Sequence, residues 1–348
     1  MNPEAFRRAH PDVFFLDAAQ PAALARHLLG LGVLARDERI ADVRRAGEGN
    51  MNCTLRVRTD LRSFIVKQAR PWVEKYPQFA APWDRALREA EFYRLAQRAP
   101  EAAALMPALL AADAEARLLV VQDLGEAGDY TDLYHGGTPE PSELATLSRY
   151  LAALHGVRAE SPATPVANRE MRALNHAHIF DLPLRPGGGP DLDAVTPGLS
   201  TVAEELRTDA ALRAEVKRLG EAVYLGDGPC LIHGDFFLGS LVRTAAGPRV
   251  IDPEFGFFGR AEFDVAVFLA HLLLADQPPA VVAAWLEANR GAAGCDESLV
   301  LQLVGVEVIR RLIGYAQLPL RCGLEQKAGL LGQAAGLVRE PTAAGLGF

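Results

Sequence analysis

The sequence predicts an α+β fold of two lobes, in which a small antiparallel sheet is followed by a mainly helical lobe. Its 348 residues are more than one ordinary hydrophobic core organises. Residues 40–69 alternate short β-rich runs with turn residues, whereas beyond residue 125 apolar residues recur mostly at helical spacing. We therefore expect the sheet lobe to span residues 1–124 and the helical lobe residues 125–348.

The sheet lobe is predicted to contain two helices and a short sheet. Helical spacing of apolar residues predicts helices over residues 21–34 and 84–97. The run 40–69 predicts three antiparallel strands, with a glycine-rich turn between the first two and a tight turn between the next two. RLLVVQDL, residues 117–124, is typical of a buried strand and connects to the second lobe.

The helical lobe is predicted to contain one β-rich island among its helices. In residues 229–255, short apolar runs are separated by polar loops. The helical segments that we predict around this island are 142–157, 261–275, 279–290, 297–316 and 324–338.

Composition excludes several classes of partner. The net charge of −8 argues against binding to nucleic acid, because phosphate backbones favour clustered Lys and Arg. The four cysteines form no CxxC pair, and no apolar run reaches the length of a membrane span. We therefore expect a cytoplasmic protein that binds neither nucleic acid nor a membrane.

Two acidic loops follow apolar runs of the island. Asp235 ends the run LIHGD, where its carboxylate is placed to orient a hydroxyl group or to accept its proton. Asp252 and Glu254 flank a proline and offer the hard oxygen ligands that Mg²⁺ prefers. Either loop alone could be an ordinary turn capped by an acid, but two such loops at a hairpin's separation favour a shared site for phosphoryl transfer.

Lys67 lies in a β-rich run that follows the glycine-rich turn. A lysine in a strand usually points to solvent, but at this position its ammonium group could reach the phosphates of ATP while Glu89 holds it. Glu91 is the competing acid and lies on another face of the same predicted helix. The turn could bring backbone N–H groups to phosphates or be a plain tight turn. The residues of this turn that we expect to contact the nucleotide are Gly47, Gly49 and Asn50.

Together the motifs resemble the aminoglycoside-phosphotransferase and choline-kinase-like superfamily, and most closely methylthioribose kinases. The resemblance runs from about residue 40 to 330 and rests on GNMN, FIVKQARPWV, DRALREAEF, QDL, LIHGD…GS and VIDPEFGFFGRAEFDVAVFLAHLLLA. It implies a protein-kinase-like bilobal fold, with ATP between the lobes and Mg²⁺ as cofactor. Asp-Pro-Glu stands where protein kinases have Asp-Phe-Gly, and Gly-Ser replaces the usual Gly-Asn.

The resemblance also implies roles for residues that spacing alone does not assign. The backbone of Gln122 to Leu124 would meet the adenine, and Ser240 would assist Asp252 and Glu254 at the metal.

The segment VEVIRRLIGYAQ resembles the family's paired-arginine helix, so Arg310 and Arg311 would face the substrate or the transferring phosphoryl group. The alternative is that one arginine pairs with a core acid such as Asp264.

These inferences predict an ATP-dependent phosphotransferase that acts on a hydroxyl of a small molecule, with 5-methylthioribose or a related sugar as the first candidate. The chain departs from methylthioribose kinases at Phe237, where they have a second histidine, and at Gln122, where they have an acid. An aminoglycoside, an amino alcohol and a nucleotide-binding pseudokinase remain the alternatives. A homodimer is left open, because related kinases occur as monomers and as dimers.

Overall fold

The computed structural model describes residues 3–47, 51–160, 167–290 and 295–347, which form two compact units. The first unit comprises residues 1–98 and 106–126, and the second comprises residues 99–105 and 127–348. Within the described ranges, no helix combines the length and the apolar character needed to cross a membrane.

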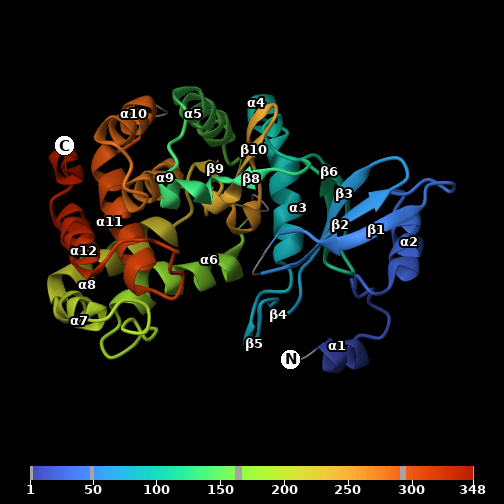
Figure 1. Cartoon of the computed structure of the whole chain (residues 1–348), viewed down its shortest axis with the longest axis horizontal. Coiled ribbons are helices and arrows are strands. Elements are labelled where there is room, and N and C mark those ends of the chain that lie inside the picture. Colours follow the sequence, from blue (N-terminus) through green and yellow to red (C-terminus); the bar gives the residue numbers. More distant parts are fainter. Residues whose placement is uncertain (1–2, 48–50, 161–166, 291–294, 348) are drawn as a thin grey trace. The chain divides into compact units, whose positions relative to one another are not determined.

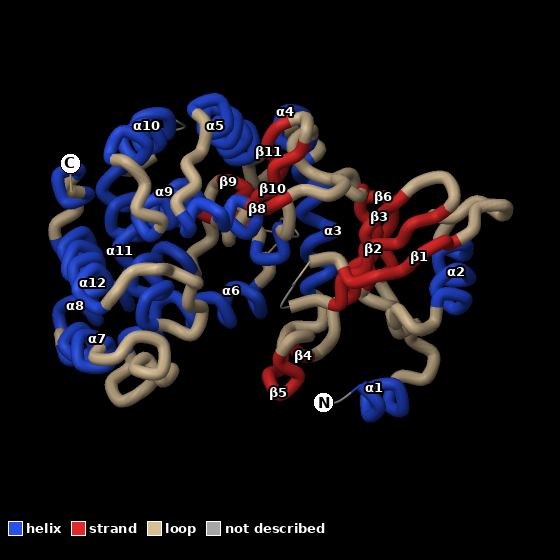
Figure 2. The backbone as a smooth tube through the Cα atoms, viewed as in Figure 1, coloured by secondary structure: helices blue, strands red, loops and turns tan. Residues whose placement is uncertain are grey.

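The first unit is built on a five-stranded antiparallel sheet with the strand order β1-β2-β3-β7-β6 (Figures 1 and 2). A separate two-stranded hairpin, β4–β5, follows β3 in the chain. The elements of this unit are α1 (Pro3–Ala9), α2 (Pro21–Gly30), β1 (Ile40–Arg45), β2 (Cys53–Thr59), β3 (Ser63–Gln68), β4 (Trp72–Val73), β5 (Tyr76–Ala80), α3 (Arg85–Ala96), β6 (Leu109–Asp113) and β7 (Leu118–Gln122).

Each face of this sheet packs against a different helix, because side chains alternate along a strand. On β3, Phe64 and Val66 join the core that includes Leu24 and Leu28 of α2. Residues 65 and 67 point to the other face, where Leu119 of β7 packs against alanines of α3. This alternation places Lys67 on the side of the sheet that faces α3.

The sequence analysis missed two parts of this unit. The edge strand β6 pairs with β7, and its alanine-rich composition gave no β signal. The hairpin β4–β5 lies in a proline-containing segment to which we assigned no strand, and all residues of β5 are exposed. Strand β5 carries Pro77, which an edge strand tolerates.

The second unit is mainly helical, as predicted. Its long helices are α5 (Pro141–His155), α9 (Ala261–Leu274), α10 (Pro279–Arg290), α11 (Glu297–Ile313) and α12 (Leu324–Arg339), close to the predicted segments. Its shorter helices and turns are α4 (Pro100–Ala103), η1 (Tyr130–His135), α6 (Arg169–His176), η2 (Ala177–Asp181), η3 (Leu182–Leu184), α7 (Leu199–Thr208), α8 (Ala210–Arg218), η4 (Leu219–Tyr224), η5 (Leu238–Ser240), η6 (Pro253–Phe255) and η7 (Ala343–Leu346).

Two small sheets among these helices carry the acidic loops. One has the order β11-β10-β8, and the other pairs β9 with β12. The loop after β9 and the loop after β11 therefore emerge from short strands, and β9 packs against α5 and α9 while β11 packs against α5. The strands are β8 (Gly128–Asp129), β9 (Cys230–Ile232), β10 (Leu241–Thr244), β11 (Gly247–Val250) and β12 (Phe257–Gly259).

Candidate active site

Lys67 forms a buried ion pair with Glu89 in the first unit. The Lys67 Nζ lies 2.8 and 3.0 Å from the two carboxylate oxygens of Glu89 on α3. Lys67 is 6% exposed and Glu89 1%, so Lys67 is not an ordinary surface lysine. The competing acid, Glu91, instead bonds Arg88 on the helix surface. The structure therefore brings the predicted pair together, and its action on ATP stays a prediction.

The end of the glycine-rich turn is held by a buried arginine that the sequence analysis missed. Arg85, at the start of α3, donates to the carbonyl of Met51 at 2.7 Å and to the Asn52 side chain at 2.9 Å. It also donates to the carbonyl of Arg70 at 2.7 Å. Within the predicted turn, Gly47 is exposed with φ +65°, a conformation suited to glycine. Gly49 and Asn50 lie outside the described residues.

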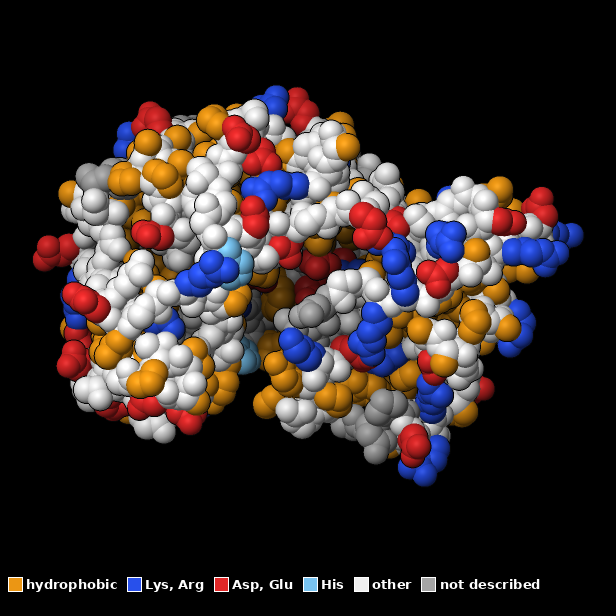
Figure 3. Space-filling view, viewed as in Figure 1, with side chains coloured by type: hydrophobic (Ala, Val, Ile, Leu, Met, Phe, Trp, Pro, Cys, Tyr) orange, Lys and Arg blue, Asp and Glu red, His pale blue; other side chains and the backbone are white. Residues whose placement is uncertain are grey.

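The segment predicted to meet adenine begins at the end of β7. The backbone N–H of Gln122 donates to the Ala108 carbonyl at 2.8 Å. This N–H is therefore engaged in a hydrogen bond within the first unit. The next residue, Asp123, bonds Arg56 of β2 at 2.9 Å, and Arg56 also donates to the Gly125 carbonyl. Figure 3 shows basic side chains over the part of the first unit that contains β1 and β2. Because Arg56 holds both flanks of Leu124, it shapes the segment that we expect at the nucleotide.

Asp235 stands on a turn that is fixed by a buried acid of the second unit. Asp264, in the first turn of α9, accepts hydrogen bonds from the backbone N–H groups of His233 at 2.7 Å and Gly234 at 2.9 Å. His155, at the end of α5, contacts the same carboxylate at 3.0 Å. Asp264 has no exposed surface. This buried network presents the half-buried Asp235 side chain at the end of β9.

The turn before Asp235 requires glycine at position 234. Gly234 has φ +80°, and a Cβ atom there would lie 2.2 Å from the Phe255 carbonyl oxygen. This close approach packs the Asp235 turn against the Asp-Pro-Glu segment.

We expect Gly234→Ala to lower kcat by about 100-fold, because a displacement of about 1 Å at a catalytic group has that effect. Gly247→Ala is the matched control, since Gly247 also has a positive φ, +95°, but open space around its Cβ position. The control should lose some stability and keep its kcat. Equal kcat values for the two variants, measured by steady-state kinetics with thermal unfolding alongside, would contradict the role of the close approach.

Hydrogen bonds to backbone carbonyls tie the two acidic loops together. The Nε2 atom of His233 lies 2.9 Å from the Ile251 carbonyl oxygen, and the Ile251 N–H donates to the Ser240 carbonyl at 2.9 Å. Asp252 has a left-handed conformation with φ +59°, which is rare for a residue other than glycine and is often found at functional sites. Glu254 is 7% exposed. These contacts link the segments that carry Asp235, Ser240, Asp252 and Glu254.

The paired arginines of α11 converge on Asp235. Arg311 Nη2 lies 3.4 Å and Arg310 Nη1 3.7 Å from its Oδ1 atom. Both guanidinium groups also pair with Glu307, one turn earlier on α11. The core acid that pairs with the arginines is therefore Glu307, whereas Asp264 anchors the turn before Asp235.

Sequence reasoning missed Glu307 and His271 as parts of this site. Each is a titratable residue inside an otherwise apolar helix, and each is at most 2% exposed. Such residues are rarely buried without a partner, which was the available signal. This signal predicts that each residue has a buried polar partner, but it does not predict which residue that partner is.

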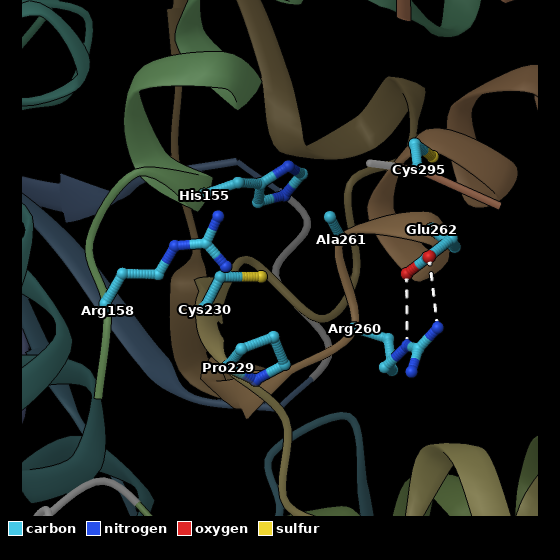
Figure 4. A pocket seen from close by; sticks show the side chains of 8 residues that line it. All are labelled: His155, Arg158, Pro229, Cys230, Arg260, Ala261, Glu262 and Cys295. Carbon is cyan, nitrogen blue, oxygen red and sulfur yellow. Dashed lines mark hydrogen bonds and ion pairs between the residues drawn. The ribbon is translucent and has the colours of Figure 1, made fainter. Parts of the chain in front are cut away.

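A pocket of about 200 Å³ lies near the turn that precedes Asp235, and none of the predicted site residues line it. It is lined in part by His155, Arg158 and Cys230, and on its other side Arg260 pairs with Glu262 (Figure 4). His155 belongs to both this pocket and the network that anchors the Asp235 turn.

The chain belongs to the phosphotransferase enzyme family, whose sequence model matches residues 42–297. It is similar to a methylthioribose kinase of Exiguobacterium sibiricum, with 30% identity over 244 residues that cover 67% of this chain and 61% of that protein. The chain spans about 60% of the length of the curated relatives that it matches first. The predicted family resemblance is thus confirmed.

Solved structures confirm the predicted fold class. A choline kinase from Streptococcus pneumoniae superposes with a TM-score of 0.53 at 13% identity, covering 92% of this chain and 99% of that one. An ADP-bound aminoglycoside phosphotransferase gives a TM-score of 0.50 at 16% identity, covering 93% and 99%. At these identities the likeness concerns the fold.

Proposed function

We propose that this chain is an ATP-dependent kinase that transfers a phosphoryl group to a hydroxyl of a small molecule. Methylthioribose or a related sugar is the first candidate, because a relative with 30% identity bears the name methylthioribose kinase. The observation that carries the proposal is the carboxylate of Asp235 on a braced glycine turn, with two guanidinium groups within 3.7 Å.

In the proposed mechanism, Asp235 accepts a hydrogen bond from the acceptor hydroxyl and aligns its oxygen with the phosphorus atom. The bond from the acceptor oxygen to phosphorus forms as the bond from phosphorus to ADP breaks, and the hydroxyl proton passes to Asp235. Arg310 and Arg311 stabilise the negative charge on the phosphoryl oxygens.

The residues proposed for the nucleotide and the metal suit those groups chemically. Lys67 would bind the phosphates of ATP, with Glu89 fixing its ammonium group. Asp252 and Glu254, assisted by Ser240, offer the oxygen ligands that Mg²⁺ prefers. Mg²⁺ neutralises phosphate charge when bound. In the described part of the chain, no group of three or more His, Cys, Asp or Glu side chains is placed to hold a metal ion.

We further propose a cytoplasmic location, because all four cysteines are free thiols.

A substrate screen tests the proposal. Purified protein with ATP and Mg²⁺ is incubated with methylthioribose, other sugars, choline-type amines and aminoglycosides, and ADP release and acceptor phosphorylation are measured. We expect methylthioribose or another sugar to give the highest kcat/KM. Turnover of an amine or aminoglycoside alone would retain the mechanism and replace the acceptor. ATP binding without any phosphoryl transfer would instead indicate a pseudokinase.

A further inference from the structure

Glu307 lies behind the two arginines that contact Asp235. Its Oε1 atom is 2.6 Å from Arg311 Nε, and its Oε2 atom is 3.1 Å from Arg310 Nη1. Positions three and four residues apart share one helix face, so α11 itself places these three side chains together. The arginines thus lie between two carboxylates, Glu307 with a side chain 2% exposed and Asp235 with one 16% exposed.

The contacts continue away from Asp235 through His271 and Tyr134. His271 Nε2 lies 3.2 Å from Glu307 Oε1, and the hydroxyl of Tyr134 bonds His271 Nδ1. A carboxylate only accepts hydrogen bonds, so Nε2–H of His271 must donate to Glu307. In a neutral imidazole, Nδ1 then accepts from the Tyr134 hydroxyl. A single arrangement of protons therefore satisfies all three groups.

Burial and the charges of the two arginines together favour this protonation state. Burial lowers the pKa of His271 to about 4 and raises the pKa of Tyr134 above its ordinary value. Burial also opposes ionisation of Glu307, but the charges of Arg310 and Arg311 hold the pKa of this carboxyl below its ordinary value.

The arginines are also held from other sides. The Arg311 guanidinium lies 4.8 Å above the ring of Phe237, which itself packs 5.4 Å from the His271 ring. Arg310 Nη2 donates to Asn175 Oδ1 at 3.3 Å. The more exposed end of this network is Asp235, where the acceptor would bind.

We propose that Glu307 is a positioning residue, and that the chain Tyr134–His271–Glu307 fixes the two guanidinium groups beside Asp235. This inference rests on the proposed function, since its purpose is to orient charges for phosphoryl transfer. Preorganised cations stabilise a transition state because they need no reorientation during the reaction. Without the negative charge of Glu307, Asp235 would be the remaining carboxylate that these arginines contact in the described chain.

Two variants test this role. Glu307→Gln should lower kcat on the order of 100-fold, the loss typical of disturbing one electrostatic group at a transition state. Tyr134→Phe removes one hydroxyl without changing charge and should lower kcat about tenfold. In both, the KM for ATP should stay close to that of the unmodified protein, because neither residue is among those proposed to bind the nucleotide or the metal.

Tyr130→Phe is the matched control. Tyr130 lies on the same short helix, η1, and its hydroxyl donates to Glu143 at 2.7 Å. Tyr130→Phe removes a comparable hydrogen bond, which is made here to a carboxylate away from Asp235. The kcat of this control should be unchanged.

A coupling measurement separates positioning from a purely structural role. If Glu307 acts through the arginines, adding Glu307→Gln to Arg311→Met should lower kcat by much less than it does in the unmodified protein, because only Arg310 then remains to be positioned, whereas independent effects would multiply. Multiplying losses, or kcat values of both single variants within twofold of the unmodified protein, would overturn the inference. Should Glu307→Gln fail to fold, Tyr134→Phe decides alone, because it keeps every charge in place.

An NMR measurement stands apart from activity. The ¹⁵N resonance of His271 Nδ1 should shift in Tyr134→Phe and not in Tyr130→Phe, and an unchanged resonance would refute the chain of contacts. If the unmodified protein transfers no phosphoryl group, the proposed function fails, and the contacts of Tyr134, His271 and Glu307 then have no catalytic role. Active protein with unaffected variants overturns only this inference.

Discussion

Asp235→Asn is expected to lower kcat by about 100- to 10,000-fold, because the amide can neither accept the hydroxyl proton nor carry the charge that orients it. Asparagine has nearly the same shape, and the turn around it is held by backbone bonds to Asp264, so the fold should be retained. The affinity for ATP should change little. Steady-state kinetics, isothermal titration with an ATP analogue and thermal unfolding measure these three quantities.

Asp227→Asn provides a matched control for Asp235→Asn. Asp227 is also a carboxylate that contacts two arginines, Arg169 at 2.9 Å and Arg172 at 2.7 Å, in the same unit. Its side chain is 60% exposed and no site residue is among these partners. The control should keep its kcat. An Asp235→Asn protein with kcat within tenfold of the unmodified chain would remove Asp235 from the mechanism.

Lys67→Met is expected to weaken both stability and catalysis. The substitution leaves the buried Glu89 carboxylate without the ammonium group that faces it, and breaking such a buried pair costs about 3–5 kcal/mol. Loss of the cation proposed for the phosphates should lower kcat/KM for ATP on the order of 100-fold. Denaturant unfolding and steady-state kinetics measure the two effects.

The double variant Lys67→Met, Glu89→Gln separates the two effects of Lys67. Removing both charges should restore most of the stability, because no uncompensated carboxylate remains from the pair, while kcat/KM should stay low. Arg88→Met is the surface control, since the Arg88–Glu91 pair lies on the same helix with side chains 32% and 26% exposed and should contribute less than about 1 kcal/mol. Recovery of kcat/KM in the double variant would mean that Lys67 only maintains the fold.

The fold class could be predicted because its elements have local signals. The period of apolar residues identified α9, α10, α11 and α12 to within a few residues, and the β-rich run 40–69 gave three strands. Strand β6 was not predicted, although it pairs with the next strand β7 across a short turn, because LLAAD lacks β-branched side chains. A run without β-branched or aromatic residues gives no local strand signal, so the pairing of β6 is seen only in the structure.

The motif residues of the candidate site could be predicted from the sequence. The residues that hold those motifs in place could not. Lys67 and Glu89 could be paired in advance because strand alternation and helix faces constrain where their side chains point. The contacts of Arg85 could not be predicted, because they are with carbonyl groups of segments up to 34 residues away. Backbone carbonyls occur at every position, so the sequence does not mark which ones a buried guanidinium will reach.

The amino-acid sequence by itself determined the order of the lobes, the family and the acids, lysine and arginines of the motifs, because these depend on local pattern and on residue type. Tertiary structure alone decided which buried groups meet. Asp264 bonds the turn at His233 and Gly234, whereas Glu307 bonds the arginines and reaches His271 and Tyr134. The physical reason is that a buried charge must find a partner, and only the packing of α9, α11 and the short strands determines which partner lies within hydrogen-bonding distance.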